Sequence, residues 1–295
     1  EIILPYGTLK QIQPMIKEAL VQSDFKPYES INYGQPVPLY PYQEKAVEAV
    51  KNGYYGILQS RAGSGKTQMG IALIKEFGRR TLWVTHTSDL LNQSKERAER
   101  YIDSSLIGKI TEGKVTIGKG VTFATIQTMC KLDLTQYKDM WDVVIVDECH
   151  RVAGTPTQMS MFAKVLNSLA ARHKYGLSAT VHRADGMIQA TFALLGEVVY
   201  TVPDEAIADK VMRVGIAPIA TGIKIVRECL NTDGTLNYAR LINYLCDSDL
   251  RNYVILERIM AEQDKSCLIL SDRLEHLETL MATLPPTMRD MAVMI

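Results

Sequence analysis

Residues Ser60 to Thr67, with the sequence Ser-Arg-Ala-Gly-Ser-Gly-Lys-Thr, have the composition and order of a phosphate-binding loop. Glycines in such a loop let backbone N–H groups curl around a phosphate, and the dipole of a following helix favours its negative charge. Lys66 is expected to reach the β- and γ-phosphates of a nucleotide, and the Thr67 hydroxyl to hold Mg²⁺. Ser60 stands where the strict pattern has Gly. The predicted nucleotide contacts are Arg61, Ala62, Gly63, Ser64, Gly65, Lys66 and Thr67.

Two carboxylates, Asp147 and Glu148, follow the apolar run Val143–Val146 directly. Because that run lacks polar alternation, we expect a strand buried on both faces. Parallel sheets bind ligands at the carboxyl ends of their strands, so Asp147 is a predicted Mg²⁺ ligand. Glu148 can polarise the water that attacks a γ-phosphate, and Glu148 and Lys66 are the predicted catalytic residues. A polar turn would look the same by itself, but the phosphate-binding loop upstream favours the catalytic interpretation.

An alternation of strands and helices must position these side chains. The expected strands are Gly56–Gln59, Thr81–Thr85, Val121–Thr125, Asp142–Asp147 and Tyr175–Ser178. The expected helices are Tyr42–Lys51, Lys66–Phe77, Asp89–Tyr101 and Thr157–Ala171. Strands that alternate with helices form right-handed βαβ units, which predicts an α/β fold with a parallel sheet covered on both faces.

Four segments are predicted along the chain. Residues 1–35 lack a strong period and are interpreted as an N-terminal extension or small accessory segment. Residues 36–203 carry the α/β pattern, and residues 204–222 form a predicted linker with Pro218 and Gly222 as breakers. Residues 223–295 open a second α/β unit. Its expected elements are a helix over Tyr238–Glu262, a strand over Ser266–Ser271 and a helix over Arg273–Leu284.

Composition narrows the class of protein. The chain has 33 basic and 33 acidic residues, which argues against a histone-like nucleic-acid binder but not against one that holds phosphates through backbone amides. Five cysteines without a CxxC pair favour neither a metal site nor a disulfide partner. Neither a signal peptide nor an apolar run of membrane-spanning length is recognised. We therefore expect a cytoplasmic protein with no membrane partner. A bacterial or phage-infected cell as its source is implied only by the family resemblance described next.

Together with the phosphate-binding loop, several segments resemble the motifs of superfamily 2 helicases. Leu39–Gln43 resembles their adenine-sensing Q motif, Asp147–His150 their DExH box and Ser178–Thr180 their motif III. The tail Leu268–Arg273 looks like motif IV of the second lobe. The chain is most similar to the DEAD/DEAH-like helicases grouped with the type III restriction subunit, and the resemblance covers residues 36–285.

The resemblance implies a RecA-like P-loop NTPase lobe over residues 36–203, followed by the start of a second RecA-like lobe. It implies ATP and Mg²⁺ as cofactors and an adenine contact for Gln43, whose amide can both donate and accept. Family members often carry Arg at the position of Tyr40. The residues expected to couple nucleotide state to lobe position are His150, Ser178, Ala179 and Thr180.

Other strand ends resemble the motifs that touch nucleic-acid backbone. The predicted contacts with DNA or RNA, made without reading bases, are Thr85, His86, Thr125, Gln127, Ser271 and Arg273. The threonines and Gln127 could equally be caps of the helices that follow. His182 and Arg183, after motif III, are further candidates for contact with a nucleic-acid strand or the second lobe.

The implied function is an ATP-dependent nucleic-acid helicase or translocase. A double-strand DNA translocase that does not unwind and an ATP-gated clamp without turnover stay open as alternatives. The chain lacks a segment like QxxGRxxR, the arginine-bearing motif VI of the superfamily. Since that arginine stabilises the transition state, this 295-residue form is expected to bind ATP but hydrolyse it slowly.

Overall fold

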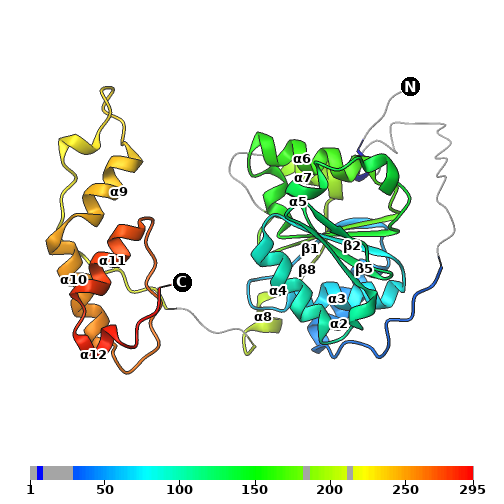
Figure 1. The fold of residues 1–295 in the computed structure, drawn as a ribbon, viewed down its shortest axis with the longest axis horizontal. Helices are drawn as coiled ribbons and strands as arrows, with labels where there is room; N and C mark the ends of the chain where they lie inside the picture. The colour runs from blue at the N-terminus through cyan, green and yellow to red at the C-terminus, as the bar shows by residue number, and fades with distance from the viewer. Residues whose placement is uncertain (1–4, 9–28, 182–186, 211–214, 295) are drawn as a thin grey trace. The chain divides into compact units, whose positions relative to one another are not determined.

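The computed structural model describes residues 5–8, 29–181, 187–210 and 215–294 (Figure 1). Its contacts divide the chain into two compact units, Glu1–Arg213 and Val214–Ile295, and each unit is described here by itself. Their boundary falls inside the predicted linker 204–222. Of the predicted N-terminal segment 1–35, only residues 5–8 and 29–35 are described, with a short 3-10 helix over Tyr6–Thr8.

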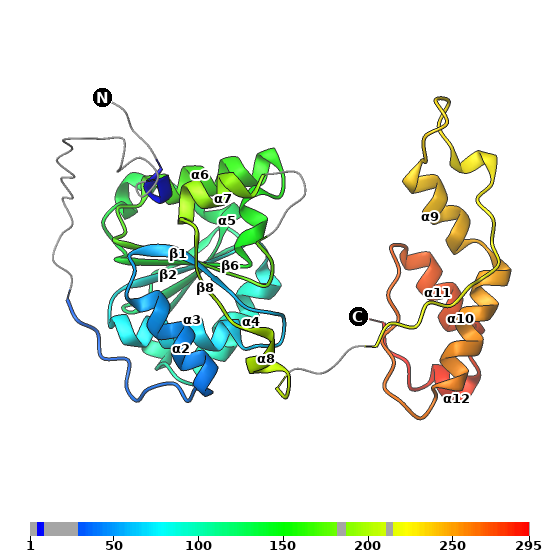
Figure 2. The same ribbon diagram turned by 180° about the vertical axis from the view of Figure 1, so that it is seen from behind.

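The first unit contains one eight-stranded sheet with the order β4-β3-β5-β2-β6-β7-β1-β8 (Figures 1 and 2). All neighbouring strands are parallel except β3 and β4, which form an antiparallel pair. The strands are β1 (Tyr55–Gln59), β2 (Thr81–Thr85), β3 (Ile107–Thr111), β4 (Lys114–Thr116), β5 (Val121–Thr125), β6 (Val143–Asp147), β7 (His173–Ser178) and β8 (Val198–Thr201).

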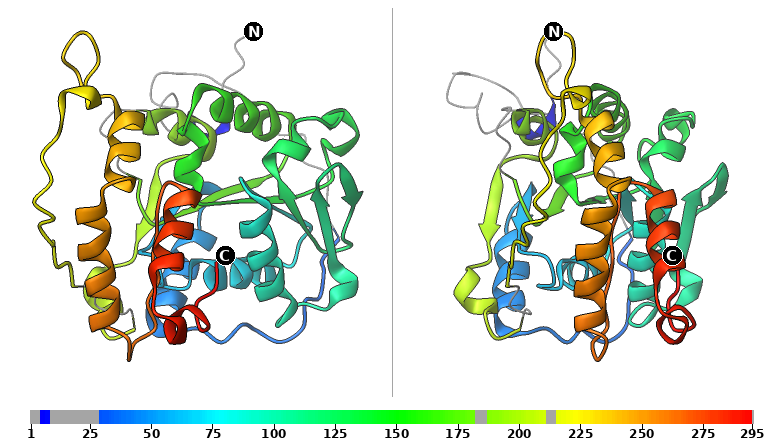
Figure 3. Two further views of the ribbon diagram at one scale, coloured as in Figure 1. Left: turned by 60° about the vertical axis from the view of Figure 1, so that its left-hand side comes forward. Right: turned by 90° about the vertical axis from the view of Figure 1, so that its left-hand side faces the viewer.

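Helices cover both faces of this sheet (Figures 1 to 3). Those on the first face are α2 (Pro41–Lys51), α3 (Lys66–Phe77) and α4 (Ser88–Glu99). Those on the second face are α5 (Ile126–Met129), α6 (Pro156–Ser168) and α7 (Ile188–Leu195). The short helix α8 (Asp204–Ile207) follows the edge strand β8, and 3-10 turns span Ser104–Leu106, Leu134–Tyr137 and Cys149–Ala153.

The side chains of each buried strand point alternately to the two faces of the sheet and so contribute to one hydrophobic core under each layer of helices. Trp83 and Ile145 enter the core shared with α2, α3 and α4, whereas Val84 and Val146 enter the core shared with α5, α6 and α7. Since successive side chains of a strand point to opposite faces, an apolar run without polar alternation must be covered twice. The predicted α/β fold with a parallel, doubly covered sheet is therefore confirmed for this unit.

The five predicted strands are all present, and their ends lie within two residues of the expected positions. Three strands were not expected. β4 has three exposed residues, β3 alternates half-buried and buried positions around Gly108, and β8 is only partly buried. Short or half-exposed strands carry a weak hydrophobic signal, because packing against their sheet neighbours defines them more than their own composition does.

The second unit departs from two expectations. The predicted helix Tyr238–Glu262 is two helices, α9 (Tyr238–Cys246) and α10 (Asp249–Ala261), because Ser248 caps the second by accepting from the N–H of Arg251 at 3.4 Å. The predicted strand Ser266–Ser271 is wrong: this run is extended without a sheet partner, and Leu270 is 82% exposed. A strand needs a ladder, and the described part of this unit holds only an isolated bridge between Leu230 and Leu236.

The remaining helices of this unit are α11 (Leu274–Thr283), close to the expected Arg273–Leu284, and α12 (Pro286–Arg289), with a 3-10 turn at Arg227–Cys229. Leu256, Leu280 and Leu284 form its small core. Among the helices that the structure describes in either unit, none has the length and apolar character to cross a membrane.

Candidate functional site

The predicted phosphate-binding loop joins the end of β1 to the start of α3. Gly63 and Gly65 have φ angles of 79° and 82°, a left-handed conformation that favours glycine. A Cβ on Gly65 would also collide with the amide nitrogen of Gln43. Gly65 offers the first turn of α3 no side-chain cap, so its backbone N–H groups are placed to receive a phosphate.

Two serines hold this loop closed from inside. The Ser60 hydroxyl donates to Ser64 Oγ at 2.6 Å, and the Ser64 hydroxyl donates to the carbonyl of Arg61 at 2.7 Å. Both serines are buried, and the Ser60 N–H donates to the Ser178 carbonyl at 2.9 Å. Ser60, the departure from the strict pattern, therefore supplies a hydroxyl that a glycine lacks and that holds Ser64 inside the loop.

Gln43 lies against the loop and is 4% exposed. Its Oε1 accepts from the Tyr40 N–H at 2.9 Å, while its Nε2 donates to the Ser64 carbonyl at 2.9 Å. The Tyr42 hydroxyl donates to the same carbonyl, also at 2.9 Å. The start of α2 thus braces the loop. The predicted adenine contact of Gln43 stays a prediction, and both ends of its amide already have protein partners.

The two predicted catalytic residues contact each other. Lys66 Nζ lies 3.6 Å from Glu148 Oε1, and His150 Nδ1 lies 3.3 Å from Glu148 Oε2. Hydrogen bonding to His150 is the main reason that the pKa of Glu148 is lowered, and the nearby charge of Lys66 contributes. Glu148 has a φ of 48°, so the chain turns sharply here and β6 delivers two adjacent carboxylates in different directions. Glu148 is therefore an ionised carboxylate facing the phosphate-binding loop.

Asp147, the predicted Mg²⁺ ligand, is 6% exposed at the end of β6. It accepts hydrogen bonds from the Ser94 hydroxyl at 3.2 Å and the Glu148 N–H at 3.0 Å. Burial, and then the charge of Glu148, raise the pKa of Asp147 to about 6. A cation beside this carboxylate would favour its ionised form, so the donor set fits Mg²⁺. Among the described residues, no group of three or more His, Cys, Asp or Glu is arranged to hold a metal ion.

The predicted coupling residues meet at the ends of β6 and β7. His150 Nδ1 lies 3.0 Å from Ser178 Oγ, which donates to the Thr180 carbonyl at 2.7 Å and accepts from its N–H at 3.3 Å. Ala179 is the half-buried residue between them. The DExH turn and the Ser-Ala-Thr turn are therefore in direct contact, while His182 and Arg183 lie outside the described residues.

Three of the predicted nucleic-acid residues, His86, Thr125 and Gln127, line a pocket of about 440 Å³ at the ends of β2, β3 and β5, and Thr85 is the last residue of β2. Thr85 and Thr125 are buried, and their hydroxyls donate to the Thr87 carbonyl at 3.0 Å and to Thr128 Oγ1 at 3.1 Å. Gln127 Nε2 donates to the His86 carbonyl at 2.6 Å and so joins two of the loops. Both hydroxyls thus have partners inside the protein.

The side chains that complete this pocket were missed in the sequence. They include the exposed cation Lys131 and the polar residues Ser88 and Thr111. Thr111 and Gly113 could have been found from the rule that sites lie at strand ends, had β3 been predicted. His86 also lines the pocket, and its buried Nδ1 has no hydrogen-bond partner; burial is the main reason that its pKa is lowered.

The last two predicted nucleic-acid residues belong to the second unit. Ser271 Oγ lies 2.8 Å from His276 Nδ1, and His276 Nε2 lies 2.9 Å from Asn252 Oδ1. Arg273 donates through Nε to Asn243 at 2.8 Å. These contacts fix the residues within their own unit.

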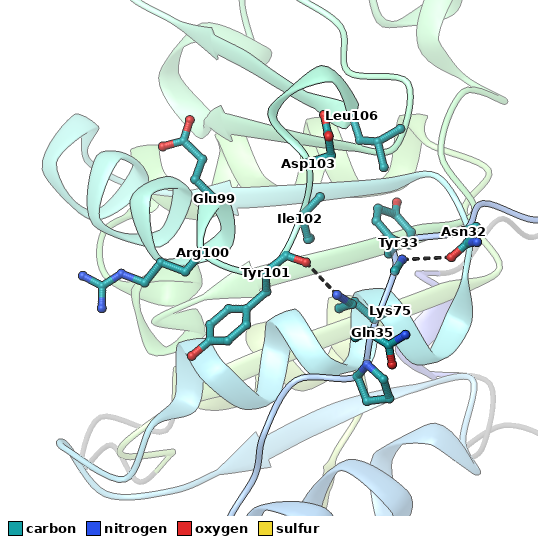
Figure 4. A pocket seen from close by; sticks show the side chains of 12 residues that line it. Asn32, Tyr33, Gln35, Lys75, Glu99, Arg100, Tyr101, Ile102, Asp103 and Leu106 are labelled. Atoms are coloured by element: carbon teal, nitrogen blue, oxygen red, sulfur yellow. Dashed lines mark hydrogen bonds between the residues drawn. The ribbon is translucent and has the colours of Figure 1, made fainter.

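Two further pockets flank the first-unit site. One of about 490 Å³ lies against the phosphate-binding loop, between the start of α2 and the end of α4. A second, of about 580 Å³, lies between the segment before α2 and the Tyr101–Leu106 turn (Figure 4). In that pocket Lys75 donates to the Tyr101 carbonyl at 2.6 Å, and the charged groups of Glu99 and Arg100 point away. It contains none of the predicted catalytic residues.

Known proteins have similar sequences. A candidate ATP-dependent RNA helicase of Acanthamoeba polyphaga mimivirus is 24% identical over 84% of this chain and 50% of its own. The DNA 3'-5' helicase XPB of Kineococcus radiotolerans is 27% identical over 83% of this chain and 44% of its own. The chain thus spans about half the length of the curated relatives it matches.

The fold has a solved counterpart in the UvsW protein of phage T4, with a TM-score of 0.51 and 18% identity over 95% of this chain and 60% of that one. This likeness concerns the fold alone. Residues 36–183, half of the chain, match the family described as the res subunit of type III restriction enzymes. They include the phosphate-binding loop, the DExH turn and the Ser-Ala-Thr turn. The chain therefore belongs to the type III restriction enzyme res subunit family.

Proposed function

We propose that this chain is the ATP-binding part of a nucleic-acid helicase or translocase, in which ATP hydrolysis drives movement along a DNA or RNA backbone. One observation carries the proposal: an unbroken series of contacts runs from Lys66 to Glu148, on to His150 and then to Ser178. An NTPase that only binds a nucleotide has no need to connect its water-activating carboxylate to a second turn.

The chemistry follows from this series. Backbone N–H groups of the loop and Lys66 bind the phosphates of ATP, which gives the ammonium group an anionic partner other than Glu148. Glu148 is then free to orient and polarise the attacking water, while His150 keeps its carboxylate in place. Thr67 and Asp147 would hold Mg²⁺, which neutralises charge on the β- and γ-oxygens when bound.

We propose that nucleic acid lies along the carboxyl ends of β2, β3 and β5. The pocket there offers Lys131, Gln127 and His86, groups suited to a phosphodiester backbone rather than to base edges. The chain has no net charge, so few phosphates are neutralised at once. Binding is therefore weak, independent of sequence and sensitive to salt, with each phosphate contact adding about 0.9 to the slope of log affinity against log salt.

The test combines calorimetry and a salt titration on the 295-residue chain. Lys66→Ala should weaken ATP·Mg²⁺ binding about 10- to 100-fold, because it removes a charged donor to the phosphates. The matched control is Lys164→Ala, which removes an exposed lysine whose ammonium donates to the Cys130 carbonyl. Equal ATP affinity in wild type and Lys66→Ala would sink the nucleotide site. Tight binding to one particular sequence at high salt would sink the backbone-directed proposal.

Strand displacement and triplex displacement separate the two forms of the motor. A helicase separates a duplex, whereas a double-strand translocase removes the third strand of a triplex and leaves the duplex intact. Both assays apply to a version of the protein with measurable ATP turnover.

A further inference from the structure

Tyr40 is an exposed aromatic ring beside the phosphate-binding loop. Tyr40 is the residue before α2 and is 51% exposed. Its ring stacks against that of Tyr42, with the centroids 5.8 Å apart and an angle of 11° between the planes. The ammonium of Lys210 lies over the Tyr40 ring, 5.2 Å from its centroid. The two residues come from opposite ends of the first unit's sequence, so this contact exists only in the folded chain.

The segment that carries Lys210 is held in place by its neighbours. Ile207, the last residue of α8, is fully buried in the core beneath α2 and α3, and the Lys210 N–H donates to its carbonyl at 2.9 Å. Asp204, at the start of α8, lies 3.7 Å from Arg61 of the phosphate-binding loop. Two charged side chains, each three residues from the Ile207 anchor, therefore reach the nucleotide site.

The pocket of about 490 Å³ connects the loop to this contact. Its walls combine Gly63–Gly65 with the rings of Tyr40, Tyr42 and Tyr101, and Lys210 lies at its border. A phosphate tail on the loop leaves the attached base among these aromatic rings, which stack on any base because every base has a π-face. A second pocket on the other side of Tyr40 also includes Lys210.

We propose that Lys210 is a latch that competes with the nucleotide base for the ring of Tyr40. The ammonium covers the ring through a cation–π contact. A base that stacks on Tyr40 must replace it, and the displaced lysine belongs to the segment that leads into the second unit. Base binding is thereby communicated to the connection between the units. The inference rests on the proposed nucleotide site and adds a residue that regulates it.

Competition makes the two residues respond in opposite directions. Tyr40→Ala should weaken ATP binding about 5- to 100-fold, the range for loss of base–aromatic stacking. Lys210→Ala should strengthen ATP binding about two- to fivefold, because an exposed cation–π contact no longer has to break. Lys210→Arg keeps a cation over the ring and should bind ATP as the wild type does. Adding Lys210→Ala to Tyr40→Ala should change nothing further.

The experiment is calorimetry on the full chain with ATP and with inorganic tripolyphosphate, which has no base. The quantity compared is the affinity for ATP divided by the affinity for tripolyphosphate, so that a general loss of positive charge cancels. The matched control is Lys119→Ala, an exposed lysine outside this pocket. A ratio that rises for Lys210→Ala alone supports the latch, and one that is unchanged or falls overturns it. If wild type and Lys66→Ala bind tripolyphosphate equally poorly, the phosphate site itself fails, and the latch fails with it.

Discussion

The carboxyl ends and the amino ends of the parallel strands lie on opposite sides of the sheet, called here its carboxyl edge and its amino edge. Both carry the same kinds of ionisable residue. At the carboxyl edge, Glu148 lies 3.6 Å from the Lys66 ammonium and 3.3 Å from the His150 ring. At the amino edge, Lys174 donates to the Leu166 carbonyl at 2.7 Å, and Asp142 lies 3.1 Å from Arg79. Burial lowers the pKa of Lys174 to about 8 and raises that of Asp142.

The histidine at the amino edge shows the contrast most clearly. His173 packs among the rings of Tyr54, Phe77 and Tyr175, with centroids 5.4, 4.6 and 6.1 Å away. His150, by comparison, contacts a carboxylate and a hydroxyl. Residue type therefore does not make a site. A parallel sheet directs helix N-termini and loops toward its carboxyl edge, and there the ionisable groups border the proposed nucleotide site rather than the core.

Two acidic residues flank β6, Asp142 before it and Glu148 after it, and the largest expected effect on ATP hydrolysis is at Glu148. Glu148→Gln should lower the rate of ATP hydrolysis about 10²- to 10⁴-fold and leave ATP affinity nearly unchanged, because an amide cannot accept a proton from water. Single-turnover assays with labelled ATP measure the rate, and calorimetry measures the affinity.

The matched variant for that prediction is Asp142→Asn at the amino end of the same strand. It should leave the hydrolysis rate of the folded protein unchanged, since Asp142 contacts Arg79 rather than the loop. A comparable loss of turnover in both variants would break the division between a catalytic and a structural edge.

The next effect concerns acid stability of the amino edge. Burial lowers the pKa of His173 from 6.5 to about 4, so the unfolded chain binds a proton that the folded chain rejects. This stabilisation is complete above pH 6.5 and is lost as the pH falls toward 4, in total about 3 kcal/mol. Urea unfolding followed by tryptophan fluorescence reports the first unit alone, because Trp83 and Trp141 both lie in its cores.

His173→Phe provides the comparison, since a phenyl ring suits the surrounding aromatic stack. The variant should lose less stability than the wild type between pH 6.5 and 4. An identical acid dependence in both proteins would show that other groups, and not His173, control this window.

The smallest expected effect is on nucleotide selectivity and concerns Gln43. This residue lies at the carboxyl edge, yet its amide forms hydrogen bonds inside the protein. If Gln43 also reads adenine, the wild type binds ATP more tightly than GTP. Gln43→Ala should then reduce ATP affinity about fivefold more than GTP affinity, the value of one hydrogen bond. Competition binding with the two nucleotides measures this. Equal losses for both would leave Gln43 with the bracing role alone.

Much of the fold could be predicted from the sequence, because its central strands are apolar runs buried on both faces. Thr81–Thr85 and Val121–Thr125 have the bounds expected from sequence. The extended run Ser266–Ser271 has the same apolar character and is not a strand. Local composition predicts which residues favour a ladder, but only neighbouring strands supply the partners that make one.

Sequence alone determined the local conformation of the proposed phosphate-binding loop, because Gly63, Gly65 and Lys66 depend only on nearby backbone angles and a helix start. Which side chains meet was decided by the tertiary structure. Thr125 became a buried hydroxyl with an internal partner, and Tyr40 came to lie beneath Lys210, 170 residues further along the chain. Local conformation follows from a few adjacent residues, whereas a side chain's partners depend on elements that are distant in sequence and adjacent only after folding.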